Sequence, residues 1–192
     1  MSQHPIGAGK SSFDLMDSEG FFKAMDLAPG MTVLDLACGQ GNYTLAMARK
    51  MGADGRIVAV DLWEEGIAAL GQSAKVLSSV SIEPHVADIR KALPIGGGSV
   101  DLCLMATVLH DIVHEGNPMP VLKEVARVLT PEGVLAVVEF KKQDSPTGPP
   151  KAIRLRLEEV SALLLRVGLL RCSGVVDLGP ELYFARFRRL RS

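Results

Sequence analysis

The chain has 192 residues, of which 47% are hydrophobic and 22% are charged, and its net charge is −1. This composition is typical of one globular domain with a large apolar core, so we expect a single domain over residues 1–192. A near-neutral charge argues against nucleic acid as a partner, because duplex binders carry a basic excess. No apolar run approaches the roughly 18 residues of a membrane span, and three widely spaced cysteines do not form a disulfide framework. We therefore expect a cytoplasmic protein with reduced thiols and no stable membrane insertion.

The apolar pattern predicts alternating strands and helices. Residues 12–27 have apolar side chains at helical spacing, with a break expected at Gly20. Strands are then expected at 32–37, 56–61, 80–87, 99–106 and 134–140, helices at 42–51, 63–77 and 118–129, and a turn at 130–133. A polar loop at 141–151 precedes a helix at 156–167 and an antiparallel hairpin of strands 170–178 and 182–189. This order indicates an α/β fold with a mostly parallel sheet covered on both faces.

One stretch, Val33 to Thr44, predicts a ligand site. A β-branched apolar run containing Asp35 is followed by Gly39 and Gly41 and then by a helical pattern from about residue 42. The glycines have no side chain to hold a ligand away from the backbone. The first turn of the helix has free N–H groups that point toward the same place. We expect a nucleotide-like ligand at this turn.

Further polar residues occur where the predicted strands end. Asp61 ends the second strand and Asp88 follows the third, while His110 and Glu139 occur near the ends of the next two. The carboxyl ends of parallel strands meet at one edge of the sheet, so these side chains should converge. Asp61 can accept hydrogen bonds from both hydroxyls of a ribose, and Asp88 from an adenine amino group. The competing interpretation is that each acid only caps the helix or turn that follows it.

The same residues discriminate between ligands. The dinucleotide motif needs a third glycine, and Thr44 stands in its place. Asp35 would repel a pyrophosphate but would attract a cation. S-adenosylmethionine carries an ammonium, a sulfonium and a carboxylate that can use the helix N-terminus. The pattern therefore favours S-adenosylmethionine over NAD and disfavours a nucleotide-dependent oxidoreductase.

Taken in order, these motifs resemble the class I S-adenosylmethionine-dependent methyltransferases. The similarity is to the small-molecule branch that includes the ubiquinone/menaquinone-biosynthesis C-methyltransferases. It rests on the segment 33–41, Asp61, the segments 87–89, 99–101 and 109–111, and the segment 122–133. The resemblance implies a Rossmann-like three-layer sandwich with a seven-stranded sheet in the order 3-2-1-4-5-7-6 and an antiparallel last strand.

The resemblance also implies roles for individual residues. It puts the methionine part of S-adenosylmethionine at the turn, the ribose at Asp61 and the adenine beside Leu62. The full implied set of cofactor-binding residues is Asp35, Ala37 (where a glycine is common), Gly39, Gly41, Asp61, Leu62, Asp88, Ile89 and Ala106. The implied activity is methyl transfer to a small-molecule acceptor, and the alternative is a protein that binds S-adenosylmethionine without catalysis. The sequence names neither the acceptor nor the atom that is methylated, and it leaves open whether the chain forms a homodimer.

Candidate bases near the ends of the fourth and fifth strands are His110, Asp111, His114 and Glu139. His110 is the catalytic candidate, because it follows the fourth strand and can titrate near neutral pH. A base is required only if the nucleophile arrives protonated. The competing interpretation is that His110 orders its loop or packs under the cofactor. His110 and His114 have a metal-ligand spacing, but no third ligand is evident, so we expect no metal site. We expect residues 1–28 to form a helical lid on a core of residues 30–192, with the loop at 143–151 opposite the lid.

Overall fold

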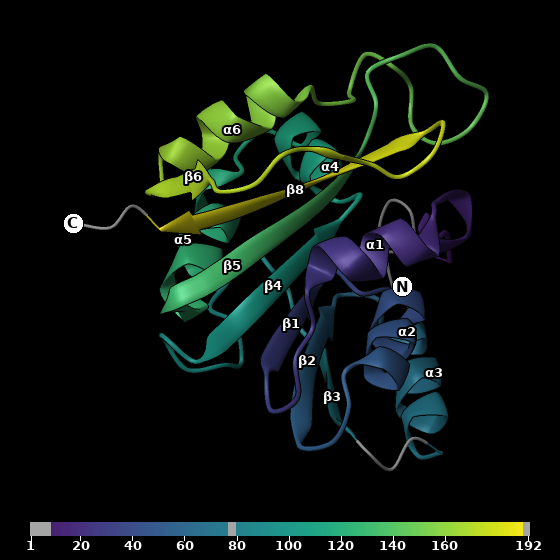
Figure 1. Ribbon diagram of the computed structural model, residues 1–192, viewed down its shortest axis with the longest axis vertical. Coiled ribbons are helices and arrows are strands. Elements are labelled where there is room, and N and C mark those ends of the chain that lie inside the picture. The colour runs from purple at the N-terminus through teal and green to yellow at the C-terminus, as the bar shows by residue number, and fades with distance from the viewer. Residues whose placement is uncertain (1–8, 77–79, 190–192) are drawn as a thin grey trace.

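The computed structural model describes residues 9–76 and 80–189, which form a twisted sheet between two layers of helices (Figure 1). The strand order is β3-β2-β1-β4-β5-β8-β6, and β7 also pairs with β8. The strands are β1 (Thr32–Leu36), β2 (Gly55–Asp61), β3 (Val80–Val86), β4 (Val100–Ala106), β5 (Leu129–Phe140), β6 (Leu169–Arg171), β7 (Val176–Asp177) and β8 (Leu182–Arg189). Neighbours from β3 to β5 are parallel, and β8 runs antiparallel to β5 and β6. The predicted α/β class and strand order are confirmed: β8 takes the place of the predicted seventh strand, and the short β7 is an additional strand of the sheet.

The helices divide between the two faces of the sheet. They are the 3₁₀ turn η1 (Phe13–Leu15), α1 (Ser18–Met25), α2 (Asn42–Lys50), α3 (Glu64–Ala74), α4 (Leu109–His114), α5 (Met119–Val128) and α6 (Leu157–Leu165). Helices α1 to α3 cover one face and α4 to α6 cover the other (Figure 1). Alternate residues of β1 follow this division: Leu34 and Leu36 pack in the cluster with α4 to α6, and Val33 packs in the cluster with α1 and α2. Asp35 has the parity of Val33, which explains why it meets a residue of α2.

The N-terminal helical segment differs from its prediction. The break lies at Met16 and Asp17, and Gly20 is inside α1. Asp17 sets the start of α1, because its carboxylate accepts the backbone N–H of Glu19 and caps the helix. A Cβ at Gly20 would lie 2.5 Å from Asp17 Oδ2. The glycine therefore makes room for the cap, and the expectation that it breaks the helix was wrong.

Three other predicted elements have different boundaries in the structure. Residues 130–133, expected as a turn, lie within β5, where the register against β4 jumps from Val100↔Leu129 to Leu102↔Val134. The predicted strand 170–178 is divided into β6 and β7, which both pair with β8. The predicted helix 63–77 ends at Ala74, and its last expected residue is outside the described residues. None of the helices among residues 9–76 and 80–189 is long and apolar enough to cross a membrane.

The polar segment 141–155 is organised around Arg154, which has 0% exposure. Its guanidinium donates hydrogen bonds to the carbonyls of Pro149 (2.9 Å), Lys141 (3.0 Å) and Thr147 (2.5 Å). It also lies 3.5 Å from a carboxylate oxygen of Glu181. One buried cation therefore replaces the regular secondary structure that this segment lacks.

We predict that Arg154→Met lowers the free energy of unfolding by about 3 kcal/mol, because it leaves buried carbonyls without donors. Urea unfolding monitored by circular dichroism measures the change. The control is Arg156→Met, whose side chain is 67% exposed and forms an i,i+3 ion pair with Glu159; its effect should stay within about 0.5 kcal/mol. Equal midpoints for the two variants would show that Arg154 does not hold the segment.

Candidate functional site

The turn from β1 to α2 depends on left-handed backbone conformations. Ala37, Gly39 and Gly41 have φ values of 61°, 57° and 84°. A Cβ at Gly39 would have no atom within 4 Å, so the backbone of this residue faces open space. A Cβ at Gly41 would instead collide with the side chain of Leu70 in α3. Gly39 therefore serves the site, whereas Gly41 allows α2 to pack against α3.

Asp61, at the end of β2, joins the turn to the start of α3. Its Oδ2 accepts the N–H of Gly39 at 2.7 Å, and its Oδ1 accepts the N–H of Trp63 at 2.7 Å. The capping interpretation is therefore correct in part, since the carboxylate does bind the backbone before α3. Each carboxylate oxygen keeps a further lone pair. Asp61 can thus hold the turn and accept hydrogen bonds from a ligand at the same time.

Asp35 is buried at 1% exposure and accepts a 2.5 Å hydrogen bond from the hydroxyl of Thr44. Burial raises the pKa of Asp35 to about 7, although the Thr44 hydrogen bond lowers it; the charge of Asp61 raises it further. Thr44, which stands where a third motif glycine would be, is the donor that stabilises this carboxylate. The pair forms because β1 presents Asp35 toward α2.

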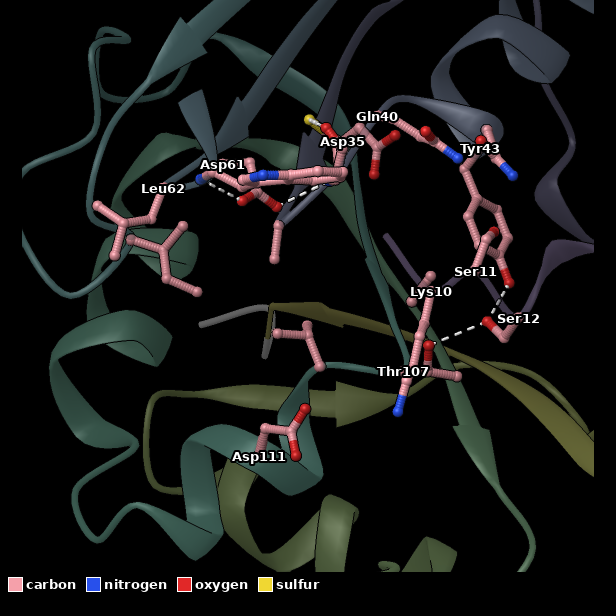
Figure 2. Close-up of a pocket in the computed structure, with 18 of the residues that line it drawn as sticks. Lys10, Ser11, Ser12, Asp35, Gln40, Tyr43, Asp61, Leu62, Thr107 and Asp111 are labelled. Carbon is pink, nitrogen blue, oxygen red and sulfur yellow. Dashed lines mark hydrogen bonds between the residues drawn. The ribbon is translucent and has the colours of Figure 1, made fainter. Parts of the chain in front are cut away.

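A pocket of about 430 Å³ opens at this edge of the sheet. Seven of the ten predicted site residues line it: Asp35, Ala37, Gly39, Asp61, Leu62, Ile89 and Ala106. Figure 2 shows Asp61 and Leu62 on one side of the cavity, Tyr43 and Ser11 on the other, and the Lys10 side chain extending past Thr107 toward Asp111. The volume is within the range of small-molecule sites. The sheet edge therefore does bring the predicted acids Asp35 and Asp61 together.

Three predicted residues, Gly41, Asp88 and His110, are not among those that line this pocket. Asp88 accepts the backbone N–H of Arg90 at 3.0 Å, which is the capping role that competed with contact to adenine. Its neighbours Ile89 and Arg90 line the cavity in its place. Arg90 also forms an ion pair with Glu115, which follows α4, and this pair joins two walls of the pocket.

His110 is 3% exposed and lies behind the wall that α4 contributes. Its Nδ1 is 2.8 Å from Glu139 Oε2, and its backbone N–H donates to Glu139 Oε1. Its Nε2 is 3.5 Å from Oδ1 of Asp111, which does line the pocket. Burial lowers the pKa of His110, but the hydrogen bond and charge of Glu139 and the charge of Asp111 outweigh it, so the net shift is upward. The pKa of Asp111 is also raised, chiefly because the carboxyl group is partly buried.

The N-terminal segment supplies pocket residues that do not lie at the end of a strand, so the strand-end pattern does not predict them. Ser12 is 4% exposed, and its hydroxyl is 2.8 Å from that of Tyr43 and 2.9 Å from that of Thr107 (Figure 2). Lys10 and Ser11 line the pocket beside it. Within the predicted lid, residues 10–12 line the cavity, whereas α1 packs in the core through Phe21 and Met25, and residues 1–8 are outside the described residues. No residue of the loop at 143–151 lines this pocket.

The structure places the two histidines that have a metal-ligand spacing and the three cysteines. His110 is buried near the start of α4 and His114 is exposed at its end. Among residues 9–76 and 80–189, no three His, Cys, Asp or Glu side chains are grouped as a metal site would require. The cysteines are free thiols, of which Cys38 lines the pocket.

Comparison with known proteins gives relatives that include quinone-biosynthesis methyltransferases. The ubiquinone/menaquinone biosynthesis C-methyltransferase UbiE of Laribacter hongkongensis is 31% identical over 121 residues, which cover 63% of this chain and 48% of that protein. The demethylmenaquinone methyltransferase of Lactococcus lactis is 28% identical over 147 residues, covering 71% and 57%. The chain thus spans about half the length of these curated relatives.

Solved structures agree on the fold. A SAM dependent methyltransferase from Aquifex aeolicus superimposes with a TM-score of 0.81 and 27% identity, covering 95% of this chain and 94% of that one. A putative type 11 methyltransferase from Sulfolobus solfataricus has a TM-score of 0.71 at 20% identity, covering 93% and 95%, and shows the fold alone. The methyltransferase domain family matches residues 27–166, which is most of the chain and contains the turn, Asp61 and Asp111. The chain therefore belongs to the methyltransferase domain family.

Proposed function

We propose that the protein transfers a methyl group from S-adenosylmethionine to a small-molecule acceptor. The observation that carries this proposal is the Asp61 carboxylate, which is held by the N–H groups of Gly39 and Trp63 and still faces the pocket. The family relationship and the quinone methyltransferase relatives support it. The three free cysteines, two of them buried, support a reducing compartment such as the cytoplasm.

The residues present fit S-adenosylmethionine. Asp61 offers lone pairs for ribose hydroxyls, and Leu62 and Ile89 offer apolar surface for a base. Asp35 supplies negative charge for an ammonium, whereas it would oppose a pyrophosphate. The open space at Gly39 allows the ligand to approach the backbone. When bound, S-adenosylmethionine supplies an electrophilic methyl group on a sulfonium.

On the acceptor side, we propose that Asp111 accepts a proton from the nucleophile. Asp111 lines the cavity, and His110 Nε2 lies 3.5 Å from its carboxylate. Glu139 fixes the His110 ring from behind at 2.8 Å. His110, proposed from the sequence as the catalytic residue, then acts as a positioning residue that orients Asp111. A raised pKa brings Asp111 closer to neutral pH, where a general base is effective.

We predict that Asp61→Ala weakens binding of S-adenosylmethionine by about 1–3 kcal/mol, the free energy of lost hydrogen bonds to a charged group. Isothermal titration calorimetry measures it. Asp61→Asn keeps one acceptor and should lose less. Asp144→Ala, whose side chain is 87% exposed, should bind as the wild type does. Wild-type affinity in Asp61→Ala contradicts the role of Asp61, and tight NAD binding without binding of S-adenosylmethionine contradicts the proposed function.

A pH dependence follows from Asp35. Because the pKa of Asp35 is about 7, its carboxyl group is mostly protonated at pH 6 in the protein without ligand. Pairing with an ammonium requires that this proton leave. Affinity for S-adenosylhomocysteine, which carries the same ammonium, should rise roughly eightfold from pH 6 to pH 7.5. Calorimetry at several pH values tests this. Asp35→Asn should bind more weakly with a flat profile, and a wild-type affinity that falls over this range contradicts the prediction.

Catalysis is tested by incubating the protein with labelled S-adenosylmethionine and fractionated metabolite extract, and we expect one labelled small-molecule product. Asp111→Asn should slow its formation by about 100-fold, the lower range for loss of a general base. His110→Gln should shift the pH profile of the rate, because it changes the charge beside Asp111. Transfer at the wild-type rate by Asp111→Asn would refute its role. Binding without transfer in any fraction would favour a non-catalytic protein.

A further inference from the structure

Lys10 is the unpaired cation of the pocket. The cavity is lined by the carboxylates of Asp35, Asp61, Asp111 and Glu115 and by two basic side chains, Lys10 and Arg90. Arg90 is engaged by Glu115 and lies 3.8 Å from Asp88. Lys10 makes neither a hydrogen bond nor an ion pair with any residue in 9–76 or 80–189. A cation left without a counter-charge in a binding cavity favours an anionic group on the ligand.

The backbone beside Lys10 is held in place. The Ser12 hydroxyl bridges Tyr43, in the first turn of α2, and Thr107, directly after β4. Phe13 packs edge-on against Tyr43, with ring centroids 5.2 Å apart. These contacts hold the N-terminal segment against the start of α2 and against the residue that follows β4. Lys10 is therefore presented to the cavity by an anchored segment.

Lys10 also lies at a defined end of the cavity. Figure 2 shows Ser11 and Tyr43 across the cavity from Asp61 and Leu62, with the Lys10 side chain beginning beside Ser11 and extending past Thr107. A ligand whose ribose contacts Asp61 and whose base lies on Leu62 extends its remaining part toward α2 and the N-terminal segment. In S-adenosylmethionine this remaining part is an amino acid, which carries an ammonium and a carboxylate.

We propose that Lys10 binds the α-carboxylate of the methyl donor, an assignment that rests on the proposed function. Asp35 then faces the ammonium and Lys10 the carboxylate, so the two charges of the amino-acid end meet opposite charges on two separate segments. The N-terminal segment becomes part of the donor site through this ion pair. An adenosine derivative without the carboxylate could not form this ion pair with Lys10.

Calorimetry with two ligands tests the assignment: S-adenosylhomocysteine and its decarboxylated amine analogue. Lys10→Met should weaken binding of S-adenosylhomocysteine about tenfold and change binding of the decarboxylated analogue by less than about twofold. Lys10→Arg should restore most of the affinity. Lys23→Met, an exposed lysine on α1, is the control for a change in net charge and should have no effect. Thermal unfolding confirms that each variant is folded.

The outcomes separate the two proposals. An equal loss for both ligands would show that Lys10 acts only through the packing of its segment, and no loss for either would show that it does not contact the donor; both results overturn the assignment. A wild-type protein that binds neither ligand would overturn the proposed function and this assignment with it.

Discussion

The site depends on one carboxylate that holds three segments of the chain. Asp61 ends β2, accepts the N–H of Gly39 from the turn after β1, and accepts the N–H of Trp63 before α3. Without it, two backbone donors near the pocket would lack partners, and the left-handed turn would lose its link to the neighbouring strand. The residue proposed to bind the ribose is thus also the residue that shapes the turn. Structure and ligand recognition share this group because each carboxylate oxygen can accept more than one hydrogen bond.

The second acid gives the pocket its electrostatic character. Asp35 is buried next to Thr44 and close enough to Asp61 to be affected by its charge. Keeping two acids at adjacent strand ends is unfavourable for the free protein, since each raises the cost of ionising the other. A cationic ligand relieves this cost, whereas a pyrophosphate would increase it. The acids beside this glycine turn therefore favour a cationic ligand over a dinucleotide.

Features that depend on one strand end were predictable from sequence, and features that depend on distant partners were not. Asp35, Gly39 and Asp61 follow from an apolar run and the residues directly after it, so their placement needed only the rule for parallel sheets. The packing role of Gly41 depends on Leu70 in another helix, a contact that leaves no local pattern. His110 and Glu139 do converge as their strand ends require, but the burial of this pair outside the pocket lining does not follow from the strand ends. Predicted boundaries failed for the same reason, as at Gly20, where a cap from Asp17 decides the outcome.

The two segments outside the regular fold are each held by one buried polar residue. Ser12 ties the N-terminal segment to Tyr43 and Thr107, and Arg154 binds three carbonyls of the segment that follows β5. Polar anchors of this kind demand specific partners, whereas apolar burial tolerates many. The donor-side residues Asp35, Gly39 and Asp61 lie at strand ends, whereas the N-terminal segment reaches the pocket through the contacts of Ser12. The sequence therefore indicates the donor and leaves the acceptor unnamed.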